Sequence, residues 1–136
     1  MSKTIIQKIV VATVVLHRNK VLLLQRSKTE EILPGLWELP SGKRKNLESF
    51  IQTIKREVKE ETGLRVGVID PISTFEYIIE KSEMIKDTTQ INYLVKVKGP
   101  SKVKISKEHQ KFAWVKKKDL FRYKITKEIK KVISKI

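Results

Sequence analysis

The chain has 136 residues, of which 40% are hydrophobic and 33% charged, and its formal net charge is +15 at pH 7. This length predicts a single domain, residues 1–136, that is large enough to bury a core. The absence of cysteine excludes disulfides and thiolate chemistry and fits a reducing cytoplasm. No apolar run reaches the roughly 20 residues of a membrane span, so we expect a cytoplasmic protein without a membrane partner.

The basic composition has two interpretations. An electropositive surface attracts polyanions, so nucleic acid is a possible partner. However, the lysines are spread along the whole chain without interleaved aromatic residues. This distribution favours ordinary solvated lysines over a nucleic-acid interface.

The first third of the chain has the composition of strands separated by a turn and a loop. Runs of β-branched and apolar residues are typical of buried strands, and the first run is interpreted as a strand rather than a signal peptide. Asn19 can adopt the left-handed backbone of a tight turn, and Pro40 ends the third run. The predicted strands are residues 5–16, 21–25 and 36–39, with a turn at 17–20 and a loop at 27–35.

A helix is predicted from about residue 48 to residue 62. Residues 53–62 contain no Gly or Pro and are rich in helix-favouring Lys, Glu and Arg, and Gly63 supplies a left-handed end. The predicted apolar stripe consists of Phe50, Ile51, Ile54 and Val58. Three carboxylates, at positions i, i+3 and i+4, share a face beside this stripe: Glu57, Glu60 and Glu61.

Such clustering is costly, because carboxylates at close range repel one another and raise each other's pKa values. A hard divalent cation removes the repulsion, and Mg²⁺ suits a site of carboxylates and substrate phosphates. We therefore predict Mg²⁺ as cofactor, with Mn²⁺ as a possible substitute. The alternative is an amphipathic helix whose glutamates pair with lysines four residues away.

The second half of the chain predicts further strands and a closing helix. Pro71 interrupts the first of these strands, because proline cannot donate to a sheet ladder. The predicted strands are residues 65–68, 73–79, 89–98 and 111–115, with a connection at 81–88, a helical turn at 117–120 and an amphipathic helix at 126–136. Strands mixed with two helices at these spacings favour an α/β/α sandwich around a mixed sheet.

A spaced motif occupies residues 42–64. Gly42 is followed after five residues by Glu48, and after seven more by Arg56-Glu57-Val58-Lys59-Glu60-Glu61-Thr62-Gly63-Leu64. This segment resembles the Nudix box at every specified position. The resemblance extends to residues 34–43 (PGLWELPSGK) and 108–115 (EHQKFAWV), which look like the corresponding segments of MutT-type nucleoside triphosphate pyrophosphohydrolases.

The resemblance implies a Nudix fold and metal-dependent hydrolysis of a nucleoside diphosphate linked to another group. The implied metal ligands are Glu57, Glu60 and Glu61, with a backbone carbonyl from Ser41 or Gly42. Glu108 corresponds to a late carboxylate near the metal, and either Glu57 or Glu108 is the expected base. Glu48 and Arg56 are the expected orienters, and Gly63 is expected to end the helix.

Substrate contacts are less specified. Arg26 is a candidate phosphate ligand, because guanidinium binds phosphate bidentately, or else a surface residue. Trp37 and Tyr77 are candidates for stacking on a base, although aromatic residues in strands are more often core. His109 is either a proton shuttle or, more often for such a residue, structural.

The preferred substrate is a nucleoside triphosphate or modified nucleotide, cleaved to the monophosphate and pyrophosphate. The alternatives are ADP-ribose, a dinucleoside polyphosphate, a capped RNA end, and a non-catalytic nucleic-acid-binding module with the same fold. Both a monomer and a homodimer remain open.

Three departures from the MutT pattern concern substrate choice. Ser41 stands where glycine is commoner, which requires a backbone that does not demand glycine. The loop at residues 43–46 is basic, where relatives usually carry an acidic residue and a glycine before the box glutamate. No Asn follows Asn92, whereas enzymes that remove oxidised guanine nucleotides often read the base with a late Asn, and this argues against that substrate.

Overall fold

The computed structural model describes residues 2–31 and 33–136. Their strands form a seven-stranded mixed sheet in the order β3-β2-β1-β6-β5, with β4 beside β1 and β7 beside β2. The elements are β1 (Thr4–His17), β2 (Lys20–Arg26), β3 (Trp37–Glu38), β4 (Ser41–Lys43), α1 (Phe50–Thr62), β5 (Val66–Glu80), β6 (Met84–Val97), β7 (His109–Lys116), the 3₁₀ helix η1 (Lys117–Arg122) and α2 (Lys127–Ile133). Ile32, within the predicted 27–35 loop, lies outside the described residues.

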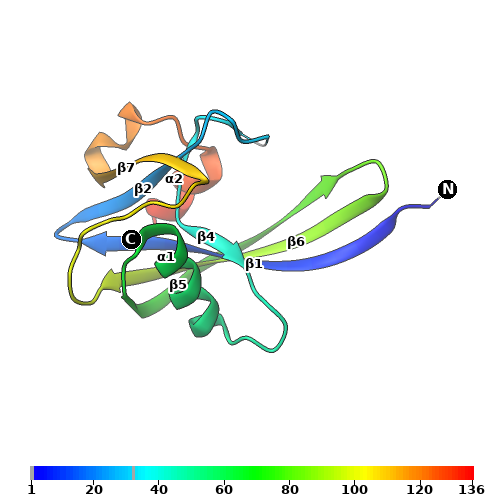
Figure 1. Ribbon diagram of the computed structural model, residues 1–136, viewed down its shortest axis with the longest axis horizontal. Coiled ribbons are helices and arrows are strands. Elements are labelled where there is room, and N and C mark those ends of the chain that lie inside the picture. The colour runs from blue at the N-terminus through cyan, green and yellow to red at the C-terminus, as the bar shows by residue number, and fades with distance from the viewer. Residues whose placement is uncertain (1, 32) are drawn as a thin grey trace.

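The sheet is covered on both faces, with α1 on one side and α2 on the other (Figure 1). Successive strand residues point to opposite faces, so Val11 and Val15 of β1 pack with the α1 side while Val14 packs with the α2 side. Fully burying one such side chain contributes about 1.5–3 kcal/mol. The predicted sandwich around a mixed sheet is therefore confirmed.

Helix α1 begins at Phe50 rather than near residue 48. Ser49 caps it: its hydroxyl accepts from the Gln52 amide, and the Gln52 side chain accepts from the Ser49 amide. At the other end Gly63 has φ 74° and donates its N–H to the Lys59 carbonyl, as predicted for a left-handed helix end. The predicted apolar stripe is too wide, because Ile51 is 53% exposed and Ile54 and Val58 carry the buried face.

β5 and β6 form a long antiparallel hairpin that projects from the body as an arm, with the first half of β1 parallel to β6 (Figure 1). The predicted break at Pro71 is wrong. β5 continues through it with register shifts between Val68 and Asp70 and between Pro71 and Ser73. An edge strand tolerates proline, because the missing N–H faces away from the sheet.

Other element boundaries also differ from the sequence-based expectation. The connection predicted at 81–88 is shorter, since β6 already begins at Met84. The short strand β4 was not predicted; it pairs with β1 from Val10 to Ala12. Helix α2 ends at Ile133, and its N-cap is Thr126, whose hydroxyl accepts from the Ile129 amide. Among the described residues, no helix is long and apolar enough to cross a membrane.

Candidate active site

Strand β4 brings the start of the box against helix α1. Ser41 pairs with Ala12 in extended conformation, so serine fits where glycine is commoner. The Ser41 amide donates to Oε1 of Glu61 at 3.1 Å. A Cβ atom at Gly42 would overlap the carboxylate of Glu57. A larger residue at position 42 would therefore displace the Glu57 carboxylate, and glycine allows the backbone to approach this side chain closely.

Arg56 ties the box loop to the helix. Its guanidinium donates to both oxygens of Glu48, at 2.7 and 3.0 Å, and to the Lys43 carbonyl at 2.9 Å. It also donates to Glu57 at 2.6 Å. The hydrogen bonds from Arg56 and Thr53 hold the pKa of Glu48 well below its usual range. Glu48 and Arg56 thus occupy the positions that the predicted orienting role requires.

The three box carboxylates differ in exposure. Glu61 is 8% exposed, whereas the side chains of Glu57 and Glu60 are 15% and 56% exposed. Burial raises the pKa of Glu61 to about 9, against the hydrogen bond from Ser41. Burial likewise raises the pKa of Glu57, although its hydrogen bond with Arg56 opposes the shift. A bound cation would remove this cost of burying a negative charge for both carboxylates.

Glu108 reaches the same place from the loop before β7. That loop is fastened to the end of α1: the Lys104 amide donates to the Thr62 carbonyl at 2.8 Å, and the Ser106 amide donates to the Glu61 carbonyl at 3.3 Å. These bonds also satisfy carbonyls that the helix end leaves free. The negative charge of Glu108 contributes to raising the pKa values of both Glu57 and Glu61. The structure therefore places Glu108 close enough for its charge to act on two box carboxylates.

Glu38 is a further carboxylate here, and the sequence analysis did not single it out. It accepts from Nη1 of Arg26 at 3.2 Å and lies 2.8 Å from Nε2 of the buried His109. Its charge also acts on Glu61. Among the described residues, Nδ1 of His109 has no hydrogen-bond partner. The position of Glu38 beside Trp37 in the MutT-like segment was the signal that could have identified it.

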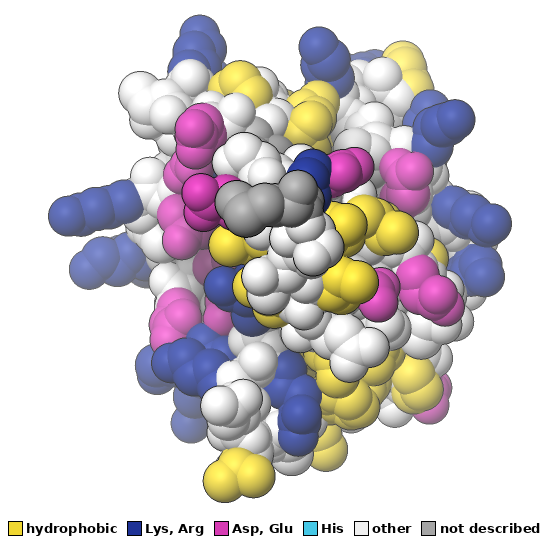
Figure 2. Space-filling view, turned by 90° about the vertical axis from the view of Figure 1, so that its right-hand side faces the viewer, with side chains coloured by type: hydrophobic (Ala, Val, Ile, Leu, Met, Phe, Trp, Pro, Cys, Tyr) yellow, Lys and Arg dark blue, Asp and Glu magenta, His cyan; other side chains and the backbone are white. Residues whose placement is uncertain are grey.

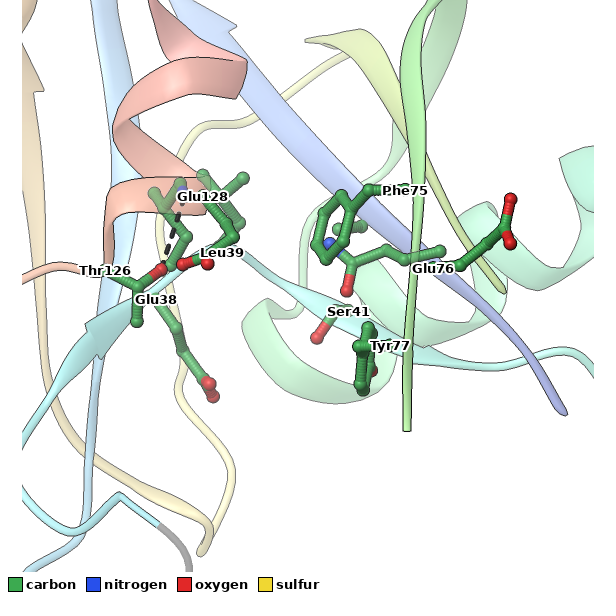
Figure 3. Close-up of a pocket in the computed structure, with 11 residues that line it drawn as sticks. Glu38, Leu39, Ser41, Phe75, Glu76, Tyr77, Thr126 and Glu128 are labelled. Carbon is green, nitrogen blue, oxygen red and sulfur yellow. Dashed lines mark hydrogen bonds between the residues drawn. The ribbon is translucent and has the colours of Figure 1, made fainter. Parts of the chain in front are cut away.

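A cleft of about 300 Å³ adjoins the carboxylates. Phe75 and Tyr77 project into it from β5 toward Ser41, whereas Glu76 points away (Figure 3). Its opposite side is formed by residues of β3 and α2. The described lining residues are Ala12, Glu38, Leu39, Ser41, Phe75, Glu76, Tyr77, Gln90, Thr126, Glu128 and Ile129. The cleft is therefore partly aromatic and carries acceptor groups at one end.

The predicted substrate contacts are not all gathered at this cleft. Tyr77 lines it. Trp37 instead packs edge-on against Tyr123, with ring centroids 5.0 Å apart, and contacts the core on the α2 side. Arg26 is held in ion pairs with Glu30 and Glu38.

The chemistry of the oxygen atoms gathered here fits a hard divalent cation. The Glu61 carboxylate accepts from the Ser41 amide, the Glu57 carboxylate lies against Gly42, and the charge of Glu108 acts on both; oxygen donors of this kind suit Mg²⁺. Among residues 2–31 and 33–136, however, no three acidic or histidine side chains already stand in a metal-holding arrangement. In this arrangement the carboxylates of Glu57 and Glu60 are paired with Arg56, at 2.6 and 3.4 Å.

The fold and the box together define a pyrophosphate-cleaving hydrolase class. The NUDIX domain family matches residues 7–136, and the chain belongs to this family. It is accordingly a Nudix pyrophosphohydrolase, as the sequence motif predicted.

Named relatives agree with this membership. The nucleoside triphosphatase NudI of Escherichia coli O139:H28 (strain E24377A / ETEC) is 28% identical over 133 residues, covering 93% of this chain and 94% of the relative. The crystal structure of a MutT protein from Methanosarcina mazei Go1 superposes with a TM-score of 0.72 at 27% identity, covering 98% and 94% of the two chains. A MutT NUDIX hydrolase from Burkholderia pseudomallei shares the fold, with a TM-score of 0.79, 19% identity and coverage of 96% and 98%.

Proposed function

We propose that this enzyme hydrolyses a nucleoside triphosphate, or a closely related nucleotide, to the monophosphate and pyrophosphate in the presence of Mg²⁺. The observation that carries the proposal is the junction at Ser41. The Ser41 amide donates to the buried carboxylate of Glu61, and Ser41 also lines the aromatic cleft. A nucleotide has two parts that fit these two features: a phosphate chain, which a cation at the carboxylates would bind, and a flat base, which the aromatic cleft would hold. The similarity to NudI and to MutT proteins supports a nucleotide substrate.

Each box residue has a distinct task in this proposal. Glu57, Glu60 and Glu61 hold the cation, together with the carbonyl of Ser41 or Gly42. Bound Mg²⁺ supplies charge neutralisation for the phosphates and a more acidic water. Arg56 keeps Glu57 oriented, because its guanidinium is itself fixed by Glu48 and by the Lys43 carbonyl.

The reaction is an in-line displacement at phosphorus, in which positioning and electrostatics provide most of the rate. A carboxylate must accept the proton of the attacking water. Glu57 and Glu108 are the two candidates, because each faces the cluster from a different element. Glu57 is the better shielded of the two, whereas Glu108 lies in an exposed turn.

The cleft is proposed to hold the base. Phe75 and Tyr77 offer aromatic surface for stacking, and Gln90 and Glu128 offer polar groups that can contact the edge of a base. The Trp37 ring contacts Tyr123, so Trp37 is proposed to pack beneath the residues that line the cleft rather than to stack on the base. Arg26 is proposed to position Glu38 and His109 through its ion pair.

The test is release of phosphate or pyrophosphate across a nucleotide panel, with and without Mg²⁺. The panel contains ordinary and oxidised dNTPs, ADP-ribose, diadenosine polyphosphates and capped RNA. We expect Mg²⁺-dependent turnover of a nucleoside triphosphate, retained at high salt. Turnover of a different panel member alone would move the assignment to that substrate. Salt-sensitive RNA binding with no turnover of any member would contradict the proposal.

A further inference from the structure

One face of the arm carries lysines without acidic partners. Residues paired in register point to the same side of a sheet, and so do residues two positions apart on one strand. In β4, Lys43 is paired with Val10 of β1, and Lys8 precedes Val10 by two positions. On the other side of β1, the register places Lys86 of β6 opposite Ile6. Lys8, Lys43 and Lys86 therefore share one face.

This face is the one that forms the aromatic cleft. Along β1 it continues from Lys8 through Val10 to Ala12, whose β4 partner is Ser41, and both Ala12 and Ser41 line the cleft. Along β5 it continues from Tyr77, the partner of Thr88, to Ile79, the partner of Lys86. The lysine group thus lies directly beyond Tyr77 on the outward side of the cleft.

The three ammonium groups are close enough to disturb one another. Burial, together with contacts with the side chains of Lys43 and Lys86, lowers the pKa of Lys8 to about 8. Within the described part of the chain, none of the three forms a salt bridge with a carboxylate. Uncompensated like charges are held together at a cost to folding, and a bound anion would remove that cost.

The surroundings add further positive charge. A hollow of about 290 Å³ next to Lys8 and Lys43 is also lined by Arg44 and Lys45. Viewed toward the end of the arm, Figure 2 shows one group of Lys and Arg side chains at the lower left with acidic side chains above it, while other Lys and Arg side chains lie around the rim. The hollow therefore adds positive charge beside Lys8 and Lys43.

We propose that Lys8, Lys43 and Lys86 form an anion site that binds a phosphate group of the substrate outside the carboxylate cluster. Ammonium groups bind phosphate by charge-assisted hydrogen bonds. A polyphosphate chain that starts at the carboxylates and continues along this face would be held at both ends. The substrate part of this inference rests on the proposed function, whereas the existence of the anion site does not.

The direct test is titration of inorganic pyrophosphate into the metal-free protein by calorimetry at low salt. Three proteins are compared: the wild type, the double variant Lys8→Gln with Lys86→Gln, and the control Lys116→Gln with Lys118→Gln. The control removes the same charge from exposed positions in β7 and η1. Lys43 is left intact, because it adjoins Gly42.

We expect the Lys8/Lys86 variant to bind pyrophosphate at least about tenfold more weakly, and the control to change by less than about twofold. Equal losses in both variants, or no loss in the first, would overturn the anion site. The thermal midpoint of the Lys8/Lys86 variant should equal or exceed that of the wild type, since repulsion is removed. A thermal midpoint no lower than that of the wild type shows that the variant is folded, so that a loss of pyrophosphate binding reports on the anion site.

A second measurement separates substrate phosphate from a free anion. With a nucleoside triphosphate and Mg²⁺, the Lys8/Lys86 variant should show a raised KM with a smaller change in kcat. Weaker pyrophosphate binding with an unchanged KM would overturn the substrate assignment and leave a site for free phosphate. An enzyme without turnover on the nucleotide panel would contradict the proposed function, and the calorimetric result would still decide the anion site.

Discussion

Glu60 is the box carboxylate with the least structural role. Its side chain is 56% exposed, and its ion pair with Arg56 is long, at 3.4 Å. An exposed pair of this kind contributes no more than about 1 kcal/mol. Glu60 nevertheless stands at a specified position of the box, which suits a group that serves a cation rather than the fold.

Glu60→Gln should therefore lower kcat by at least about 100-fold, which exceeds the usual effect of losing an outer-shell partner. The thermal midpoint should change little. Turnover with Mg²⁺ and thermal unfolding are measured on the same preparation. Glu83→Gln, in the exposed turn between β5 and β6, is the matched control and should leave both quantities unchanged. A fully active Glu60→Gln enzyme would remove Glu60 from the proposed metal site.

Leu47 is a strained and exposed residue immediately before Glu48. Its φ is 66°, a region that favours glycine, and it is 98% exposed. MutT-type relatives usually carry glycine there. The left-handed backbone costs a residue with a Cβ roughly 1–2 kcal/mol, partly offset by the greater freedom of glycine in the unfolded chain.

Leu47→Gly should accordingly stabilise the protein by about 0.5–1 kcal/mol. Denaturant unfolding at equilibrium measures this difference. Gly63→Ala provides the opposite case, since Gly63 also has positive φ and alanine there should destabilise. Lower stability of Leu47→Gly would show that the leucine side chain contributes contacts that outweigh the backbone cost.

At the residue scale, the sequence grouped side chains whose position follows from their spacing. Glu57, Glu60 and Glu61 share a helical face, and Glu108 could be placed by its motif. Glu38 was missed, because its neighbours His109 and Arg26 are 71 and 12 residues away and meet it only through pairing of β2 with β3 and β7. The edge-on contact of Trp37 with Tyr123 was hidden for the same reason.

At the scale of elements, helix α1 and the loop before it act as one unit joined by Arg56. Its planar guanidinium contacts Glu48, Glu57 and the Lys43 carbonyl at once. A lysine ammonium cannot reproduce this fixed geometry. The loop and the helix would then be free to shift relative to each other.

Arg56→Lys should reduce kcat by about 10–100-fold, the range for residues that orient metal ligands. The affinity for Mg²⁺, measured by calorimetry, should fall as well, which a purely structural role would not require. Arg65→Lys is the control, because Arg65 is exposed after the helix. Unchanged activity and Mg²⁺ affinity in Arg56→Lys would show that the guanidinium geometry is dispensable.

Local signals predicted helix α1 better than the arm. The cap and end of α1 depend on residues within the helix itself, so Gly63 was recognisable. The length of β5 and β6 depends on pairing with β1 far away in the sequence. Polar residues such as Lys86 and Asp87 therefore looked like a connection, although the ladder holds them in a strand.

At the scale of the whole molecule, the acidic site makes stability depend on pH. Glu61 has a folded-state pKa raised to about 9 from an ordinary value of 4.5. Between these values the folded protein binds more protons than the unfolded chain, so the metal-free protein loses stability as the pH rises. Glu57 acts in the same direction. The lowered pKa of Glu48 acts in the opposite sense, but below its ordinary value of 4.5.

The free energy of unfolding of the metal-free protein should therefore fall between pH 5 and pH 7.5, and it should fall less in Glu61→Gln, which has no proton to lose. Lys8, whose lowered pKa of about 8 lies just above this window, acts in the opposite direction only toward its upper end. In the proposed site Mg²⁺ binds the charged carboxylates and competes with protons, so it should raise the thermal midpoint more at pH 7.5 than at pH 5. Denaturant unfolding in chelator and thermal unfolding with Mg²⁺ measure the two effects. If the free energy of unfolding of Glu61→Gln in chelator fell with pH as steeply as that of the wild type, the buried Glu61 carboxylate would not be the source of the pH dependence. The coupling between this site and the stability of the whole protein would then have to lie in other groups.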